Sequence, residues 1–377
     1  MSRTVTKEQL LPLLQEKIET LFQEVAFVQK VGISRETRRG EGPDLVVELL
    51  GAASHQVLLI EVRTSGEPRV AREAVNALLV EKRLWPQAHP VFAAPYVSPE
   101  AAAVCRDHAI GFLDLAGNCR LAFDTLFIHH TGQANPYKSK RTLKTLGKPK
   151  SSRIIRVLLN HPRREWRTRD LAEAAGVSQG LVSQLKTILK DKEWINTAQK
   201  TISLTRPEAL LQAWIQSVSL PEDALQRLSS PLDVIQIENR IVETCQDLQI
   251  PYGFTGLSGA VHLVSGVPYR QVQVYVTELS DRLLSQLGFE QGGSEAAIAL
   301  LEAEDAGVLY GSRKVMPASR LQYARPEDKT VQAIEMEIRT RLEIVSPIQI
   351  YCDLKSKFAG CDSEADRLFH QVIQPSW

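Results

Sequence analysis

The chain has 377 residues, of which 24% are charged and 44% hydrophobic, and its formal net charge is +1. This length allows two or three domains with cores of their own, and the composition is ordinary for a globular protein. The absence of an 18-residue apolar run argues against a transmembrane helix, and residues 1–22 predict an acidic amphipathic helix instead of a signal peptide. The five Cys form no C-x-x-C pair, which favours a reducing cytoplasm over a disulfide framework or a zinc site.

Residues 1–134 predict one α/β domain. Apolar periodicity indicates helices over 7–23, 69–84 and 99–108, and strands over 25–33, 45–50, 57–62, 89–94, 111–115 and 120–129. A charged, Gly-containing loop is expected over 35–43. This order of elements predicts a central mixed sheet with flanking helices.

Two carboxylates in this domain are placed for metal chemistry. Asp44 opens one predicted strand and Glu61 ends the next, and Arg63 points to the same face as Glu61 because strand side chains alternate. Such a pair can share one Mg²⁺. The pattern resembles the PD-(D/E)xK nuclease fold, in which the Asp and Glu hold the metal and a Lys helps to activate water.

The Lys position of that motif is Arg63, which cannot accept a proton but can stabilise negative charge. Two interpretations follow: a Mg²⁺-dependent nuclease using Asp44, Glu61 and Arg63, or a degenerate nuclease fold that contacts DNA or protein without a cofactor. Further along, Asp114 and Asn118 flank a Gly117 turn, and we expect them to set that turn by local hydrogen bonds.

Positive charge is concentrated in the middle of the chain. Residues 136–205 hold 16 Lys and Arg against 5 acids, whereas the segments before and after carry net charges of −2 and −8. Residues 135–152 contain Pro, Gly and several Lys but no acid, and they predict a basic linker that orders on DNA or stays a solvated connection.

Residues 153–218 predict a winged helix-turn-helix. Ser152 is the expected N-cap of its first helix and Thr168 that of the second, which Gly176 ends; Ser178 then caps a third helix over 179–190. Two short apolar runs, at 194–195 and 201–204, predict a β-hairpin in the position of the wing.

Two sets of side chains in this domain predict DNA contacts. The polar face of the third helix would enter the major groove through Ser178, Gln179, Gly180, Ser183, Gln184 and Lys186. The phosphates would be held by Arg163, Arg164, Arg167, Thr168, Arg169 and Lys200.

Residues 232–377 predict a third α/β domain after a boundary near Pro221 and Pro231. Helices are expected over 234–248, 257–264, 279–287, 348–355 and 363–373, and strands over 252–255, 271–277, 296–301 and 308–310. A Gly-rich turn at 253–259 followed by a strand without acids resembles a nucleotidyltransferase fold lacking its metal site, which favours a role in protein interaction.

The chain resembles the AbiEi-like antitoxin and transcriptional-regulator family of type IV toxin–antitoxin systems. The matching stretches are Gly111–Leu121, Gly307–Val315 and Ser346–Leu354, together with the winged helix. The resemblance implies operator binding and repression of an operon that also encodes a nucleotidyltransferase toxin. In that family the winged helix more commonly opens the chain, whereas here it is central.

Three functions therefore stand as hypotheses: a DNA-binding regulator, a Mg²⁺-dependent DNase guided by its winged helix, and a protein-interaction scaffold on DNA. The expected partners are double-stranded DNA and a cognate toxin or other protein bound by the C-terminal domain. No membrane partner is expected, and the sequence leaves open whether the chain forms a homodimer.

Overall fold

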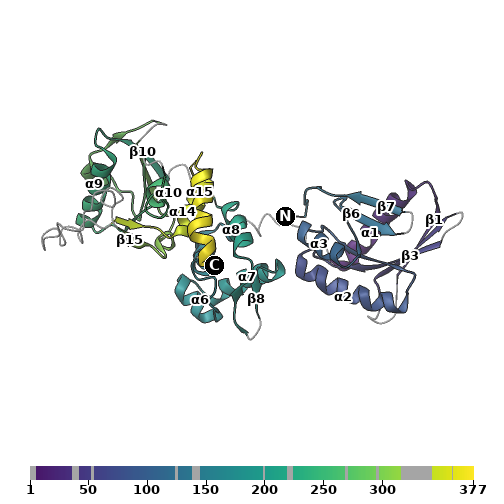
Figure 1. The fold of residues 1–377 in the computed structure, drawn as a ribbon. Coiled ribbons are helices and arrows are strands. Elements are labelled where there is room, and N and C mark those ends of the chain that lie inside the picture. Colours follow the sequence, from purple (N-terminus) through teal and green to yellow (C-terminus); the bar gives the residue numbers. More distant parts are fainter. Residues whose placement is uncertain are drawn as a thin grey trace. The chain divides into compact units, whose positions relative to one another are not determined.

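The computed structural model describes residues 6–35, 42–51, 55–123, 126–137, 145–197, 200–218, 224–267, 271–293, 297–315, 342–358 and 360–377. The chain is a mixed α/β protein that divides into two compact units (Figure 1). Unit 1 comprises Met1–Thr142 with Thr187–Glu193, and unit 2 comprises Leu143–Lys186 with Trp194–Trp377. Within the described ranges, no helix combines the length and the apolar character that spanning a membrane requires.

Unit 1 is built on a seven-stranded sheet in which the strands lie side by side in chain order. They are β1 (Val28–Arg35), β2 (Leu45–Gly51), β3 (His55–Val62), β4 (His89–Ala94), β5 (Gly111–Asp114), β6 (Cys119–Phe123) and β7 (Leu126–His130). The β3–β4 and β4–β5 pairs are parallel and the other four pairs are antiparallel. The predicted mixed sheet is therefore confirmed.

Helices cover this sheet on both faces, because alternate strand residues point to opposite sides. Helix α1 (Lys7–Gln23) lies on one face and buries four residues at helical spacing: Leu10, Leu14, Ile18 and Phe22. Helices α2 (Pro68–Leu84) and α3 (Pro99–Asp107) pack on the other face, where a second core surrounds Phe92 and Phe112. The ends of β2 and β3 lie between these two layers.

The N-terminal part of unit 2 is mainly helical. Its elements are α5 (Pro149–Asn160), α6 (Thr168–Ala175), the first part of α7 (Gln179–Asp191), β8 (Ile195–Asn196), β9 (Ser203–Leu204) and α8 (Pro207–Ile215). Residues 187–191 of α7 belong to unit 1. Gly176 ends α6 with a φ of 60°, in the left-handed region that glycine adopts without steric cost. The β8–β9 pair is antiparallel, and the buried Trp166 extends it by pairing with Ile202.

The C-terminal part of unit 2 contains a second seven-stranded sheet, in the order β13-β10-β14-β12-β11-β16-β15. Its strands are β10 (Leu225–Ser229), β11 (Tyr252–Phe254), β12 (Val272–Val276), β13 (Glu290–Gln291), β14 (Ile298–Glu302), β15 (Arg313–Val315) and β16 (Leu342–Ile344). The helices around it are α9 (Val234–Asp247), α10 (Gly256–Ala260), α11 (Asp281–Leu287), η3 (Ala306–Leu309), α14 (Pro347–Ser356), α15 (Asp362–Leu368), η4 (Phe369–Ile373) and α16 (Gln374–Ser376). In Figure 1, α9 lies on one side of this sheet, and α14 and α15 on the other.

The two parts of unit 2 are joined by polar contacts along α5. Arg156 is only 4% exposed, and its Nε donates to Gln349 Oε1 on α14 over 2.7 Å. Arg153 Nε donates to Asp305 Oδ2 over 2.9 Å, just before η3. A buried Arg is stable only when its charge and its donors are compensated, so these contacts hold α5 against the second sheet.

Several predicted element boundaries are wrong. Helix α5 begins at Pro149, and Ser152 is a buried helical residue whose hydroxyl accepts from Trp214 Nε1 over 3.0 Å. Arg167, not Thr168, is the N-cap of α6. Where a strand was predicted over 308–310, residues 306–309 form the 3₁₀ helix η3, and strands β10, β13, β15 and β16 were not predicted. The centre of the basic linker, at 138–144, and the boundary at Pro221 lie outside the described residues, as does most of the loop predicted over 35–43.

Substitution of Gly66 should destabilise unit 1. A Cβ at Gly66 would lie 1.9 Å from the main-chain oxygen of Tyr96, and that backbone cannot move freely because Gly66 also pairs with Val97. We expect Gly66→Ala to lower the free energy of unfolding by about 1–3 kcal/mol, measured by hydrogen exchange of β3 and β4 amides. Gly32→Ala is the matched control, since its Cβ would meet Glu48 Cβ at an ordinary 3.7 Å; equal effects of the two changes would contradict the steric explanation.

Candidate functional site

The ends of β2 and β3 bring Asp44, Glu61 and Arg63 together, as predicted. Asp44 precedes β2, its N–H donates to Ile60 O over 2.9 Å, and its Oδ2 accepts from Val62 N over 2.8 Å. Arg63 forms an ion pair with Glu61 through Nη1. A fourth residue, Lys7, was not predicted: its Nζ lies 2.6 Å from Asp44 Oδ1.

The electrostatics of this group are dominated by the burial of Glu61. Glu61 is 8% exposed, and burial raises its pKa, with a further increase from the Asp44 carboxylate. Arg63 and Lys7 act in the opposite direction but do not outweigh burial. The four charged groups therefore interact electrostatically as a single cluster, in which two side-chain cations balance the two carboxylates.

This cluster does not fit the metal of a PD-(D/E)xK nuclease. Mg²⁺ needs near-octahedral oxygen coordination. One Asp44 oxygen already accepts from a backbone N–H and the other faces Lys7, and Glu61 faces Arg63. Across the described part of the chain, no three His, Cys, Asp or Glu side chains are grouped so that they could hold a metal ion.

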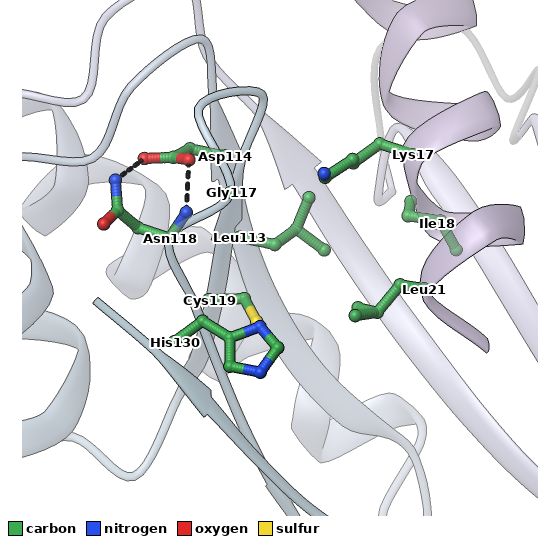
Figure 2. Close-up of a pocket in the computed structure, with 9 residues that line it drawn as sticks. All are labelled: Lys17, Ile18, Leu21, Leu113, Asp114, Gly117, Asn118, Cys119 and His130. Atoms are coloured by element: carbon green, nitrogen blue, oxygen red, sulfur yellow. Dashed lines mark hydrogen bonds between the residues drawn. The ribbon is translucent and has the colours of Figure 1, made fainter. Parts of the chain in front are cut away.

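Asp114 and Asn118 set a turn, as predicted. Asp114 is 1% exposed and accepts from Asn118 N, Asn118 Nδ2 and Val97 N at 2.8, 2.8 and 3.0 Å. The turn borders a pocket of about 40 Å³ between α1 and β5–β7, into which Cys119 also faces (Figure 2). Burial raises the pKa of the Cys119 thiol, which makes it a poor nucleophile. We assign no chemistry to this pocket.

Helix α7 presents a buried face and an exposed polar face. Val182, Leu185 and Leu189 are buried. The Ser178 hydroxyl caps the helix by accepting from Leu181 N over 3.3 Å. The predicted major-groove residues are exposed, namely Ser178, Gln179, Gly180, Ser183 and Gln184, whereas Lys186 is half-buried.

The predicted phosphate-binding residues fall into two groups. Arg163 donates through Nε and Nη2 to the main-chain oxygen of Trp377 at 2.9 and 2.7 Å, and the Arg164 guanidinium lies 3.8 Å from the ring centre of Trp166. These two side chains are therefore held by unit 2 itself. The second group consists of Arg167, Arg169 and Lys200, which are exposed as Arg163 and Arg164 are, and of Thr168, which is half-buried in the first turn of α6.

The second sheet holds a buried polar cluster around Asp353, which sequence reasoning missed. Its carboxylate accepts from Thr255 Oγ1 at 2.6 Å, from Tyr275 OH and Gln349 Nε2 at 2.9 Å each, and pairs with Lys357 Nζ at 3.0 Å. Burial lowers the pKa of Lys357, but Asp353 and Tyr275 outweigh this, so its pKa is raised and the ammonium persists. The cluster is a compensated ion pair inside the fold.

The glycine-rich turn before it is filled by a glutamine side chain. Gln273 Oε1 accepts from Leu257 N over 2.5 Å, and a Cβ at Gly256 would lie 2.0 Å from that oxygen. The backbone donor that would face a phosphate in such a turn is therefore already used.

Comparison with known proteins gives little guidance. No family model matches the chain, and no curated protein matches it. A solved structure described as an EndoMS–dsDNA2 complex is similar to part of it, with 16% sequence identity and a TM-score of 0.19. That similarity covers 27% of this chain and 44% of the other, and nothing about fold or activity is transferred from it.

The raised pKa of Glu61 predicts a pH effect on unit 1. The Glu61 carboxyl group binds its proton more tightly in the folded state than in the unfolded state. Unit 1 therefore becomes more stable as pH falls from above the raised pKa of Glu61 to below 4.5. Glu61→Gln should remove this dependence and stabilise unit 1 at neutral pH, measured by hydrogen exchange of β2 and β3 amides between pH 4.5 and 8. Glu48→Gln, at an exposed carboxylate of β2, is the control. Greater instability of Glu61→Gln at pH 7 would contradict this prediction.

Proposed function

We propose that the chain is a double-stranded DNA-binding regulator whose reading element is a winged helix formed by α5, α6, α7, β8 and β9. The observation that carries the proposal is the exposed polar face of α7. That face offers short hydrogen-bonding side chains at helical spacing, opposite the buried face formed by Val182, Leu185 and Leu189. A helix of this kind suits the major groove, where base edges present distinct donors and acceptors.

The surroundings of α7 support backbone contacts beside the groove. Arg167 and Arg169 are exposed at the start of α6, and Lys200 is exposed next to β9. Cations in such positions attract phosphate and fix the register of a protein on DNA without reading sequence. The second sheet packs against α5 and α8, as the contacts Arg156–Gln349 and Gln212–Tyr351 indicate, so α7's polar residues stay exposed.

We infer repression of its own or a neighbouring operon in the cytoplasm, in the manner of an AbiEi-like antitoxin. The nucleotidyltransferase-like sheet would then hold a toxin or another protein, because its glycine-rich turn is filled by Gln273. A homodimer would place two reading helices on a two-fold operator.

Substitutions on α7 and α6 should separate base reading from phosphate binding. The cognate site is first selected from a pool of random duplexes. Ser183→Ala and Gln184→Ala should then each reduce discrimination between this site and random DNA, by about 1–3 kcal/mol for a bidentate contact. Arg167→Ala and Arg169→Ala should weaken binding to both DNAs and lower the salt slope by about one each. The measurement is fluorescence anisotropy over a salt titration.

Arg240→Ala is the control, since Arg240 is an exposed cation on α9. Arg163→Ala should weaken DNA binding less than Arg167→Ala does, because the Arg163 guanidinium is held by the main-chain oxygen of Trp377. Equal losses on selected and random DNA in the α7 and α6 variants would overturn the assignment of roles. Failure of the wild-type protein to bind any duplex would overturn the proposed function.

The alternative hypothesis of a Mg²⁺-dependent nuclease predicts DNA cleavage, which we do not expect. Because Lys7 and Arg63 engage both carboxylates, we expect supercoiled plasmid to stay intact with Mg²⁺ or Mn²⁺, for the wild-type protein and for Asp44→Ala alike. Gel analysis of plasmid forms measures this. Metal-dependent nicking that disappears in Asp44→Ala would establish a nuclease instead.

A further inference from the structure

The cluster at the ends of β2 and β3 balances its charge without a metal ion. Two carboxylates carry a charge of −2, and one divalent cation would neutralise them. Here the compensating charge of +2 comes from two side chains. Lys7 Nζ lies 2.6 Å from Asp44, and Arg63 is paired with Glu61. Each carboxylate thus has a cation of its own.

Lys7 reaches Asp44 because α1 is fixed on the sheet. It is the first residue of α1, directly after a capping box in which Thr6 accepts from Gln9 N. Leu10, Leu14 and Ile18 bury one face of the helix in the first core of unit 1. The position of the ammonium is therefore set by packing, although the Lys7 side chain itself is 43% exposed.

We propose that Lys7 and Arg63 are built-in replacements for a divalent cation, so that unit 1 keeps a nuclease-like carboxylate pair in a state that needs no metal. Lys7 is the positioning residue, since it connects α1 to the start of β2 through Asp44. The inference concerns unit 1 alone and does not depend on DNA reading by α7.

Replacing Lys7 tests the idea in the full-length protein. Lys7→Met keeps an unbranched side chain, one atom shorter, but leaves Asp44 next to Glu61 without its cation. Exchange of β2 and β3 amides should become about two- to fivefold faster, as expected for a partly exposed ion pair. Millimolar Mn²⁺ should slow this exchange again in Lys7→Met, and should have no effect on the wild-type protein.

Three further variants make the result specific. Lys17→Met removes an exposed lysine of the same helix and should leave the exchange rates and their response to Mn²⁺ unchanged. Lys7→Arg keeps the cation and should also exchange at the wild-type rate. The double change Lys7→Met with Asp44→Asn removes cation and carboxylate together, so it should recover stability and lose the response to Mn²⁺. Mn²⁺ binding is measured independently by electron paramagnetic resonance of the free ion.

Two results would overturn the proposal. One is Mn²⁺ binding by the wild-type protein that is lost in Asp44→Asn, since the cluster would then be an ordinary metal site. The other is equal behaviour of Lys7→Met and Lys17→Met in exchange and in Mn²⁺ response. Neither result bears on DNA binding, which anisotropy measures separately.

Discussion

The buried carboxylate of Asp353 determines how unit 2 is assembled. Removing a charge from water costs several kcal/mol unless donors and a counter-charge replace the solvent. Thr255, Tyr275 and Lys357 supply part of this compensation from the second sheet and α14. The remaining donor, Gln349, also accepts from Arg156 on α5. The network that neutralises Asp353 thus also fixes the helix against which α6 packs.

Local patterns in the sequence are sufficient to predict many of the helices and strands. The apolar spacing of Leu10, Leu14, Ile18 and Phe22 predicts α1 with its observed bounds, and Gly176 predicts the end of α6. These features depend on side chains a few residues apart, where periodicity and capping operate.

The errors arose where distant residues decide the structure. Residues 306–309 form a 3₁₀ helix because Asp305 accepts from Gly307 N over 2.7 Å while it also pairs with Arg153, 152 positions away. Strand β10 was missed because its partners, β13 and β14, come much later in the chain. In the carboxylate cluster, strand alternation predicts that Arg63 points to the same face as Glu61. The contact between Lys7 and Asp44 could not be predicted in this way, because no pattern in the sequence around Lys7 indicates it.

Part of the excess positive charge in the middle of the chain is used inside unit 2. Arg153 and Arg156 join α5 to the second sheet, and Arg163 and Arg164 are held by Trp377 and Trp166. Charge counted along the sequence therefore overstates what is offered to a nucleic acid. Among the described residues of this segment, Arg167 and Arg169 at the start of α6 and Lys200 beside β9 are exposed, and the proposed backbone contact rests on these cations.

The Arg156–Gln349 contact has a consequence for how such a protein can evolve. A segment that folds by itself can be exchanged between proteins as a module. Here, cutting after α8 would leave Arg156 with neither its amide partner nor its cover, and would leave Gln349 Oε1 without the Arg156 donor. Helix α5 and the second sheet are therefore expected to fold as one piece, because the buried Arg156 depends on Gln349 for its partner.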